Sequence, residues 1–524
     1  MSAVEEARAE ESALWSMPRA VNRSPLPGDG AFMTAGWADP EPVIDPDDPV
    51  LAYTAERRSR LAQALPAELL IIPAGLPRVR SNDSDHRFRP GTDHVWLTGN
   101  GVAESVLVVD TTGGEAGSIL YLRAPSGRDG DEFWQNDALG DLWVGPRPSL
   151  AETQAALGIE TRPLADFTRD VERAARRARR IRVLPTLDES VDELVRSICG
   201  PELGPHLVLK ATLDELRLIK NDWEIGRLQL AVDGTVRGFD DCLEAWQVAR
   251  AMPRGERYLE GTFARRALVE GQGLAYGSVV ASGAHATTLH YTRNTGPLAD
   301  GDLVLMDMGV ELPSLYAADI TRTFPVSGEF TPLQRDVYSI VLRAQQAGID
   351  SLRAGVRFQD YQDACGRSLT EGLIDLGLIR CSVDEAMAPS ASYHRRWSIS
   401  RAGHMLGMDV HDCNHAPHET YLGGVLAAGH TLTVEPGLYF QPGDLTVPAE
   451  LRGLGIRIED DLVVTETSSI LLSAAMPRTP DAVEEWMARL AGWEVGPSTR
   501  SADAAYGSCG GAISSRNPPR APSR

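Results

Sequence analysis

The feature that most constrains the fold is a pair of aspartates set against apolar, strand-like segments near the middle of the chain. In "GDLVLMDMGVELPSLYAADITRTFP", residues 301–325, one apolar run ends on Asp307 and the next ends on Asp319. A carboxylate buried alone is costly, so buried carboxylates are normally paired with a cation or bound to a metal ion. Taken singly, Asp307 is more commonly a turn residue and Asp319 an acid on an edge strand. Any fold for this chain must either expose these acids or bring partners to them.

Two further segments carry histidines in apolar or glycine-rich surroundings. "TLHYTRNTG" contains His290, and "GHMLGMDVHDC" contains His404 and His411, with Gly403 and Gly407 arguing against a plain helix. Each histidine alone is more often an ordinary core or surface residue than a ligand. Together with the aspartates, they become candidates for one site.

Two alternating segments end on or contain glutamates. "TLTVEPGLYF" reads as a strand that ends on Glu435, and the proline after it keeps this glutamate extended. "GIRIEDDLVVT" alternates so that its isoleucines share one face while Arg457 and Glu459 share the other. The acids from Glu459 onward also fit a common alternative, an acidic cluster on a solvated face.

Two aspartates, two glutamates and three histidines therefore form the candidate inventory. Four converging carboxylates would repel one another unless cations neutralised them. Carboxylate oxygen with imidazole and no thiolate suits harder divalent ions such as manganese better than a structural zinc site. Four carboxylates can bridge two ions about 3.5–4 Å apart with a hydroxide between them, which is the apparatus of a hydrolase.

The chain divides into regions of different character. "ELLIIPAG" and "ESVLVVDTTGGEAGSILYLR" predict strands that alternate with helices, as in an α/β domain. A long helical stretch over 212–246 opens the next domain, where further helices are predicted over 257–270 and 332–354. The predicted divisions are a mobile lead-in over 1–50, an α/β domain over 51–210, a mixed helix and strand domain over 211–491, and a disordered tail over 492–524.

The wording and order of these motifs resemble a known family. "LMDMG", "ADITRTFPVSG", "GHMLGMDVHD", "LTVEPGLY" and "GIRIEDDLVV" are similar, in the same order, to the five ligand-bearing motifs of the pita-bread metallopeptidases. The resemblance is closest to the aminopeptidase P branch, which removes an N-terminal residue when proline follows it. "ASGAHATTLHYTRN" and "RSNDSDHRFRPGTDHVWLTG", residues 80–99, resemble the substrate-side and N-terminal signatures of that branch. This family resemblance implies an α/β N-terminal domain followed by an α+β pita-bread catalytic domain.

The resemblance also implies a role for each candidate residue. The implied metal ligands are Asp307, Asp319, His404, Glu435 and Glu459. Asp319 and Glu459 would bridge two divalent ions, most simply Mn²⁺, and a bridging hydroxide would attack the carbonyl before proline. Glu435 would accept the proton of this nucleophile. His290 and His411 would contact the substrate and stabilise the intermediate, and Arg457 would organise the site electrostatically.

This chain departs from the family pattern in two places. The aspartates are twelve residues apart rather than the usual eleven, so the extra residue is predicted in a turn around 313–314 or in a bulge. In "SISRAGH", Ser400 and Arg401 stand where the family has histidine and glycine. We expect metal binding to survive this change, with altered activity or specificity and a narrower approach to His404.

Three readings of function remain open from the sequence. The first is a manganese-dependent Xaa-Pro aminopeptidase, for which a homodimer or homotetramer is expected by resemblance. The alternatives are an Xaa-Pro dipeptidase and a catalytically weakened pita-bread module that only binds peptides. A methionine aminopeptidase is less favoured because those chains rarely carry such an N-terminal domain.

Composition and targeting signals set the expected partners and location. The net charge of −22 argues against a nucleic-acid surface. The six cysteines are scattered, the N-terminus lacks a signal-peptide pattern, and no apolar run approaches the roughly 18 residues needed to span a bilayer. We therefore expect a cytoplasmic protein without a membrane partner.

Overall fold

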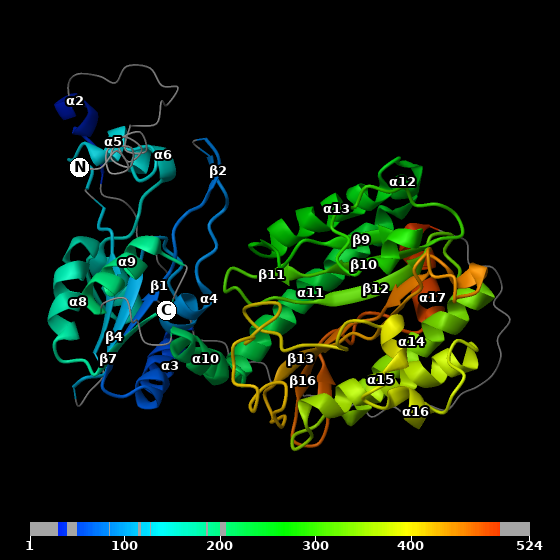
Figure 1. Cartoon of the computed structure of the whole chain (residues 1–524). Coiled ribbons are helices and arrows are strands. Elements are labelled where there is room, and N and C mark those ends of the chain that lie inside the picture. The colour runs from blue at the N-terminus through cyan, green and yellow to red at the C-terminus, as the bar shows by residue number, and fades with distance from the viewer. Residues whose placement is uncertain are drawn as a thin grey trace, which may run out of the picture.

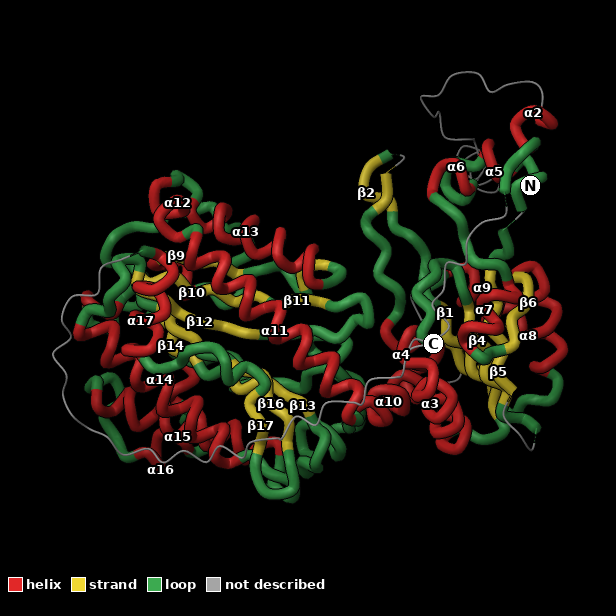
Figure 2. The backbone as a smooth tube through the Cα atoms, turned by 180° about the vertical axis from the view of Figure 1, so that it is seen from behind, coloured by secondary structure: helices red, strands yellow, loops and turns green. Residues whose placement is uncertain are grey.

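The computed structural model describes residues 30–38, 50–82, 84–113, 117–125, 127–184, 187–199 and 206–492. Most of the predicted lead-in, and the predicted tail after residue 492, lie outside these described residues. The described chain forms two bodies joined through a helix, α10, as Figures 1 and 2 show from opposite sides. Among the described residues, no helix combines the length and the apolar character that crossing a bilayer requires.

The first body is built around a five-stranded mixed sheet. Its elements, with the short helix before them, are α2 (Gly30–Thr34), α3 (Val50–Ala64), β1 (Glu68–Pro73), β2 (Val79–Ser81), β3 (Ser84–Asp85), α4 (Thr92–Thr98), β4 (Val106–Asp110), β5 (Gly117–Leu122), α5 (Glu132–Gln135), α6 (Asp141–Val144), α7 (Leu150–Leu157), β6 (Glu160–Pro163), α8 (Phe167–Ala175), β7 (Arg180–Val183), α9 (Glu189–Cys199) and α10 (His206–Arg217). The strand order is β6-β5-β4-β1-β7, and β1 is antiparallel to β4 but parallel to β7.

Burial on both faces explains the unbroken apolar run over residues 69–72 of β1. Leu70 and Ile72 pack into one core cluster with α3 and α4 residues, while Leu69 and Ile71 pack into another with residues of α8 and α9. A strand covered by helices on both sides needs apolar side chains at every position. The predicted α/β alternation is therefore observed.

The second body contains the same arrangement twice, a pair of helices packed with a three-stranded antiparallel sheet. Its elements are α11 (Asp222–Glu244), α12 (Trp246–Ala251), α13 (Gly255–Glu270), β8 (Gly273–Leu274), β9 (Val279–Ser282), β10 (Leu303–Met308), β11 (Val310–Glu311), β12 (Ile320–Pro325), α14 (Pro332–Ser351), α15 (Phe358–Asp375), α16 (Val383–Met387), β13 (Thr431–Val434), β14 (Gly437–Tyr439), β15 (Gly455–Arg457), β16 (Asp460–Val464), β17 (Ser469–Leu471) and α17 (Pro480–Ala491). One helix pair, α11 and α13, accompanies the antiparallel sheet β12-β10-β9, and another, α14 and α15, accompanies β13-β16-β17 (Figure 1).

The predicted helical stretch over 212–246 is not continuous, so that expectation is wrong. α10 ends at Arg217, and the chain then crosses to the loop before β13, where the Lys220 N–H donates to the Gly429 carbonyl at 2.9 Å. α11 starts afresh because the Asn221 side chain accepts from the Glu224 N–H at 3.0 Å in a capping box. The helices predicted over 257–270 and 332–354 are present as α13 and α14, with slightly different bounds.

Candidate metal centre

The predicted site residues converge on one cavity of about 760 Å³ where the two halves of the second body meet. Its walls include all ten singled out from the sequence: His290, Asp307, Asp319, Ser400, Arg401, His404, His411, Glu435, Arg457 and Glu459. They come from segments up to about 170 residues apart in sequence, as the numbers of His290 and Glu459 show. Considered singly, most of these residues could be ordinary turn, core or surface residues. Because all ten line one cavity, we interpret them as parts of one site.

The first half supplies the two aspartates. Asp307 lies in β10 opposite Thr321 of β12, and Asp319 immediately precedes β12 rather than ending a strand. The Tyr276 hydroxyl lies 2.6 Å from an Oδ1 atom of each aspartate. Burial, then the nearby acids, raise the pKa of Tyr276 well above its ordinary value, so the phenol keeps its single proton. One proton cannot satisfy both carboxylates at once.

The extra residue between the aspartates is accommodated in a tight turn. The Leu315 N–H donates to the Leu312 carbonyl at 2.8 Å, the Leu312 N–H donates to Tyr316 at 3.0 Å, and Leu315 has φ of 68°. This is a three-residue hairpin loop over 313–315, with the last residue left-handed. β10 and β12 pair in regular register without a bulge, and the turn over 313–315 includes the position predicted for the extra residue.

The second half supplies the two glutamates. Glu435 directly follows β13, and Glu459 directly precedes β16, which pairs with β13. The Thr321 hydroxyl donates to Glu459 Oε2 at 2.6 Å, which links the glutamate to the strand beside Asp307. Asp307, Asp319 and Glu459 each offer a ligand atom within 4.8 Å of the others, and so do His404, Glu435 and Glu459. Asp319 also forms such a group with His404 and His411.

The orientation of His404 is set by its backbone and by one ring hydrogen bond. Gly403 has φ of 149°, and a Cβ there would lie 2.0 Å from the Thr433 carbonyl, so only glycine allows this close approach to β13. His404 Nδ1 lies 3.0 Å from the Met405 carbonyl, which assigns a ring proton to Nδ1. Nε2 faces Asp319 Oδ2 at 3.3 Å and Glu435 Oε1 at 3.4 Å. Burial opposes charge on the ring, but the hydrogen bond to Asp319 and the charges of Glu435 and Asp319 outweigh burial and raise the pKa of His404 to about 9, so Nε2 carries a proton that a metal ion would displace. A backbone carbonyl that fixes the ring in this way is typical of metal-binding histidines.

The electrostatics of the site call for additional cations. Burial raises the pKa of Glu435 to about 7 and, with the neighbouring acids, raises that of Glu459 well above its ordinary value. Burial opposes charge on Asp319 too, but hydrogen bonding and charge from His404 outweigh it and lower its pKa. The single guanidinium of Arg457 is shared between two of these acids, through an ion pair with Asp307 and a longer one with Glu459 at 4.0 Å. A donor set of four carboxylates and an imidazole therefore fits two divalent ions.

The remaining predicted residues surround this cluster. The His411 ring lies 4.3 Å from the His404 ring, centroid to centroid, at 74°. His290 and Arg401 are exposed on the cavity wall, and in the part of the chain that the structure describes the Arg401 guanidinium has no hydrogen bond or ion pair. Its neighbour Ala402 accepts a hydrogen bond from the Glu435 N–H at 2.9 Å, which places Arg401 next to the cluster.

Sequence reasoning missed several residues that shape the site. Tyr276 bridges the aspartates, and the Tyr439 hydroxyl accepts from Arg457 at 2.9 Å. Asp461 Oδ2 accepts the Asp319 N–H at 3.0 Å. The suggestion that the acids from Glu459 onward form a solvated cluster is wrong, since all three are at most 1% exposed. Period-two alternation places Asp461 on the same face as Glu459, and this signal could have found it.

Comparisons with known proteins agree with the fold and the site. The sequence matches metallopeptidase family M24 over residues 228–466 and the aminopeptidase P N-terminal domain over 54–183. Xaa-Pro aminopeptidase 1 of Streptomyces coelicolor is 45% identical over 462 residues, covering 88% of this chain and 92% of the relative. Xaa-Pro aminopeptidase of Escherichia coli is 31% identical, covering 83% of this chain and 97% of the relative.

Solved structures give the same answer. Aminopeptidase P from E. coli with the inhibitor Pro-Leu superposes with a TM-score of 0.73 at 29% identity, covering 84% of this chain and 98% of that one. Proline aminopeptidase P II from Yersinia pestis gives a TM-score of 0.73 at 31% identity, covering 84% and 99%. The fold and site thus define a metallopeptidase with an N-terminal α/β domain and a pita-bread catalytic domain. Within that class, the chain belongs to the Xaa-Pro aminopeptidase family, and the predicted family and fold are confirmed.

Proposed function

We propose that this enzyme releases the N-terminal residue from peptides that carry proline in second position. The observation that carries the proposal is the sharing of ligand atoms in the cavity. Glu459 belongs both to the group with Asp307 and Asp319 and to the group with His404 and Glu435, while Asp319 joins a further group with His404. Two acids common to adjacent groups are what a pair of neighbouring ions requires.

The proposed ligands divide between two ions. Asp307 would complete one set, His404 and Glu435 would complete the other, and Asp319 and Glu459 would serve both. When bound, the ions supply Lewis-acid polarisation of the substrate carbonyl and a nucleophile available at neutral pH. The absence of thiolates from the donor set supports Mn²⁺ as the working metal. The remaining chemistry belongs to side chains of the cavity.

Glu435 is the proposed proton acceptor. Its Oε1 has a weak contact with the Thr433 hydroxyl at 3.5 Å, so the carboxylate is not saturated by protein donors. His411 and His290 are exposed toward the cavity, where a ring N–H can donate to the oxyanion and to the leaving proline nitrogen. All three side chains line the same cavity.

The cavity walls also carry side chains that could contact the substrate at proline and at the residue after it. Apolar side chains that can contact a proline ring are Val279, Leu289, Val410 and Leu422. Ser400 and Arg401, which replace the family's histidine and glycine, add a hydroxyl and a guanidinium at the same cavity, and the guanidinium has no hydrogen bond or ion pair with any described residue. We assign Arg401 to a carboxylate on the residue after proline, either the C-terminus of a tripeptide or an acidic side chain.

The test uses metal-stripped protein supplied with Mn²⁺ and three peptides. The peptides are a tripeptide with proline second, an Xaa-Pro dipeptide and a Met-Ala peptide. Release of the first residue from the tripeptide, lost in Glu435→Gln, supports the proposal. Cleavage of the dipeptide alone indicates a dipeptidase, and two bound ions without turnover on any peptide indicate a binding module.

We also propose a cytoplasmic location and a homodimer or homotetramer. The proposed location rests on the scattered cysteines, and the proposed assembly rests on family resemblance. Fractionation of the native cell and light scattering of the purified chain test these two statements separately from activity.

A further inference from the structure

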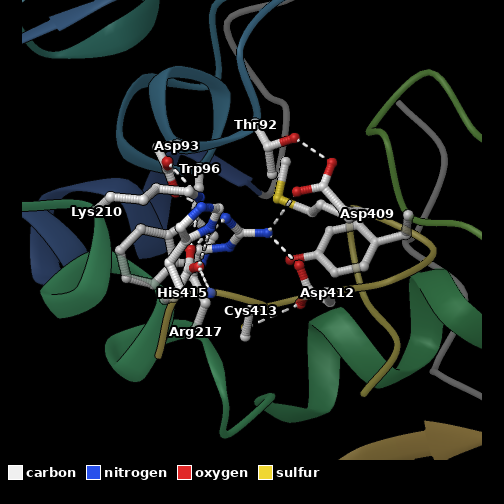
Figure 3. Close-up of polar contacts among 12 residues, drawn as sticks. Thr92, Asp93, Trp96, Lys210, Arg217, Asp409, Asp412, Cys413 and His415 are labelled. Atoms are coloured by element: carbon white, nitrogen blue, oxygen red, sulfur yellow. Dashed lines mark hydrogen bonds and ion pairs between the residues drawn. The ribbon is translucent and has the colours of Figure 1, made fainter. Parts of the chain in front are cut away.

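The loop that carries His411 is held by residues from outside the catalytic domain. The Thr92 hydroxyl, at the start of α4, donates to Asp409 Oδ1 at 2.6 Å. Arg89 donates to the same carboxylate at 3.2 Å and to the Met408 carbonyl at 2.7 Å (Figure 3 shows the Thr92–Asp409 contact). Both Arg89 and Thr92 belong to the N-terminal signature over 80–99, to which the proposed chemistry gives no role.

A second set of contacts fixes the other side of the loop. Asp412, next to His411, is bound by Arg217 and by Lys220 Nζ at 2.9 Å, and these three side chains are at most 2% exposed. Arg217 also donates to Asp93 of α4 at 2.7 Å, so the chain of contacts returns to the N-terminal domain (Figure 3). Burial raises the pKa of Asp412, but Arg217 and Lys220 outweigh burial and hold it well below its ordinary value. The carboxylate is therefore ionised and firmly held.

His411 itself depends on this support. In the described ranges, its ring makes no hydrogen bond, and its ring contact is with His404. Gly407 lets the loop close on itself, because a Cβ there would lie 2.1 Å from Asp412 Oδ2. The backbone on either side of His411 is held at Asp409 and Asp412 by the side-chain contacts above, and at Asp412 also by its N–H, which donates to the Met405 carbonyl at 2.9 Å. This backbone sets where the His411 ring lies.

We propose that the N-terminal domain positions His411 for catalysis, with Arg89, Thr92 and Asp93 as positioning residues that act through Asp409, Arg217 and Asp412. The inference rests on the proposed function, since it assumes that His411 contacts the substrate. If these contacts only docked the two domains, their loss would lower stability without affecting the part of catalysis that depends on His411. The proposal predicts that catalysis through His411 is affected as well.

The test is Thr92→Val, an almost isosteric change that removes one hydroxyl outside the cavity. The hydroxyl donates to Asp409 and also accepts from Arg89 at 3.1 Å. We expect its loss to lower kcat for a tripeptide with proline second about tenfold, while metal content stays unchanged and the thermal midpoint falls by no more than about 4 °C. In a His411→Ala background, the same substitution should have no further effect, because residues that act as a unit are not additive. Asp409→Asn should reproduce the effect of Thr92→Val.

A matched control is Thr161→Val, whose hydroxyl donates to the Leu150 carbonyl at 2.8 Å within the N-terminal domain. Hydrogen exchange of residues 404–416 gives a readout without activity, and it should rise in Thr92→Val but not in Thr161→Val. Unchanged exchange and kcat in Thr92→Val, or an equal loss in the His411→Ala background, would overturn the proposal. If wild type itself cleaves no peptide, the proposed function fails, while the exchange result still decides whether Thr92 orders the loop.

Discussion

Arg457 forms an ion pair with Asp307 directly behind the candidate metal centre, and both residues are at most 8% exposed. Removing the arginine would leave a buried carboxylate uncompensated. We expect Arg457→Met to destabilise the metal-free protein by about 3–5 kcal/mol and the Mn²⁺-loaded protein by much less, since bound cations offset the lost charge. Urea unfolding with and without metal measures both values, and Arg457→Lys is the charge-conserving control. Equal losses in the two forms would contradict this account.

Metal stoichiometry should follow the sharing of ligands. Glu459→Gln removes an acid common to two ligand groups and should abolish binding of both ions, whereas Asp307→Asn should leave about one ion per chain. Activity should fall about a thousandfold or more in Glu459→Gln. Elemental analysis after dialysis is the measurement. Glu270→Gln, which changes a partly exposed acid paired with Arg237, should retain two ions.

Arg401 should discriminate between charged and neutral substrates. We expect Arg401→Gln to raise KM about three- to fivefold for a tripeptide with a free carboxylate, the scale of an exposed charge pair. KM for the corresponding amide should not change. A peptide amide with aspartate after proline, compared with its asparagine counterpart, separates an acidic side chain from the C-terminus as the recognised group. Equal effects on all four peptides would exclude recognition of a carboxylate by Arg401.

Stability should depend on pH through His94. Its Nδ1 lies 2.9 Å from the Ile72 carbonyl, its Nε2 lies 3.0 Å from the Ser105 hydroxyl, and the residue is completely buried. Burial lowers its pKa to about 4, against about 6.5 when unfolded. Below pH 6.5 the unfolded chain binds a proton that the folded chain rejects, so stability falls as pH drops from about 6.5 to about 4, by roughly 3 kcal/mol.

The measurement is urea unfolding of the metal-free protein at pH 7 and pH 5. His94→Gln should show a smaller loss between these two values than wild type, because glutamine keeps a donor and an acceptor but does not titrate. If His94→Gln loses as much unfolding free energy between pH 7 and pH 5 as wild type, His94 does not contribute to the pH dependence of stability. His290→Gln is the matched control. Because His290 is exposed, this substitution should leave the loss of stability between pH 7 and pH 5 as it is in wild type.

The sequence was most informative where local pattern and chemistry coincide. Asp307, Glu435 and Glu459 could be found because each interrupts or ends an apolar strand, and a buried acid in a strand demands an explanation. Asp319 was found in the same motif, although it precedes its strand. Tyr276 could not be found in this way, because a tyrosine near an apolar segment needs no special explanation and its two partners lie 31 and 43 residues away.

The errors have equally local causes. The apolar periodicity of 212–246 continues through the break between α10 and α11, and the pairing of Lys220 with the distant Gly429 cannot be read from that segment. The acids that follow Glu459 resemble a solvated cluster in composition. Their burial becomes evident only when the pairing of β16 with β13 is known. In both cases the observed structure depends on contacts between residues far apart in sequence, which local helix and strand propensities do not reveal.

The bond between Asp93 and Arg217 limits how this chain can be recombined with its relatives. A chimera that takes its first 200 residues from another family member, without a carboxylate at the position of Asp93, would bury the guanidinium of Arg217 with one counter-charge missing. The foreign domain would also need the hydroxyl and the guanidinium that meet Asp409. Exchange of domains between relatives should therefore succeed only when residues 89–93 and 408–412 come from the same parent.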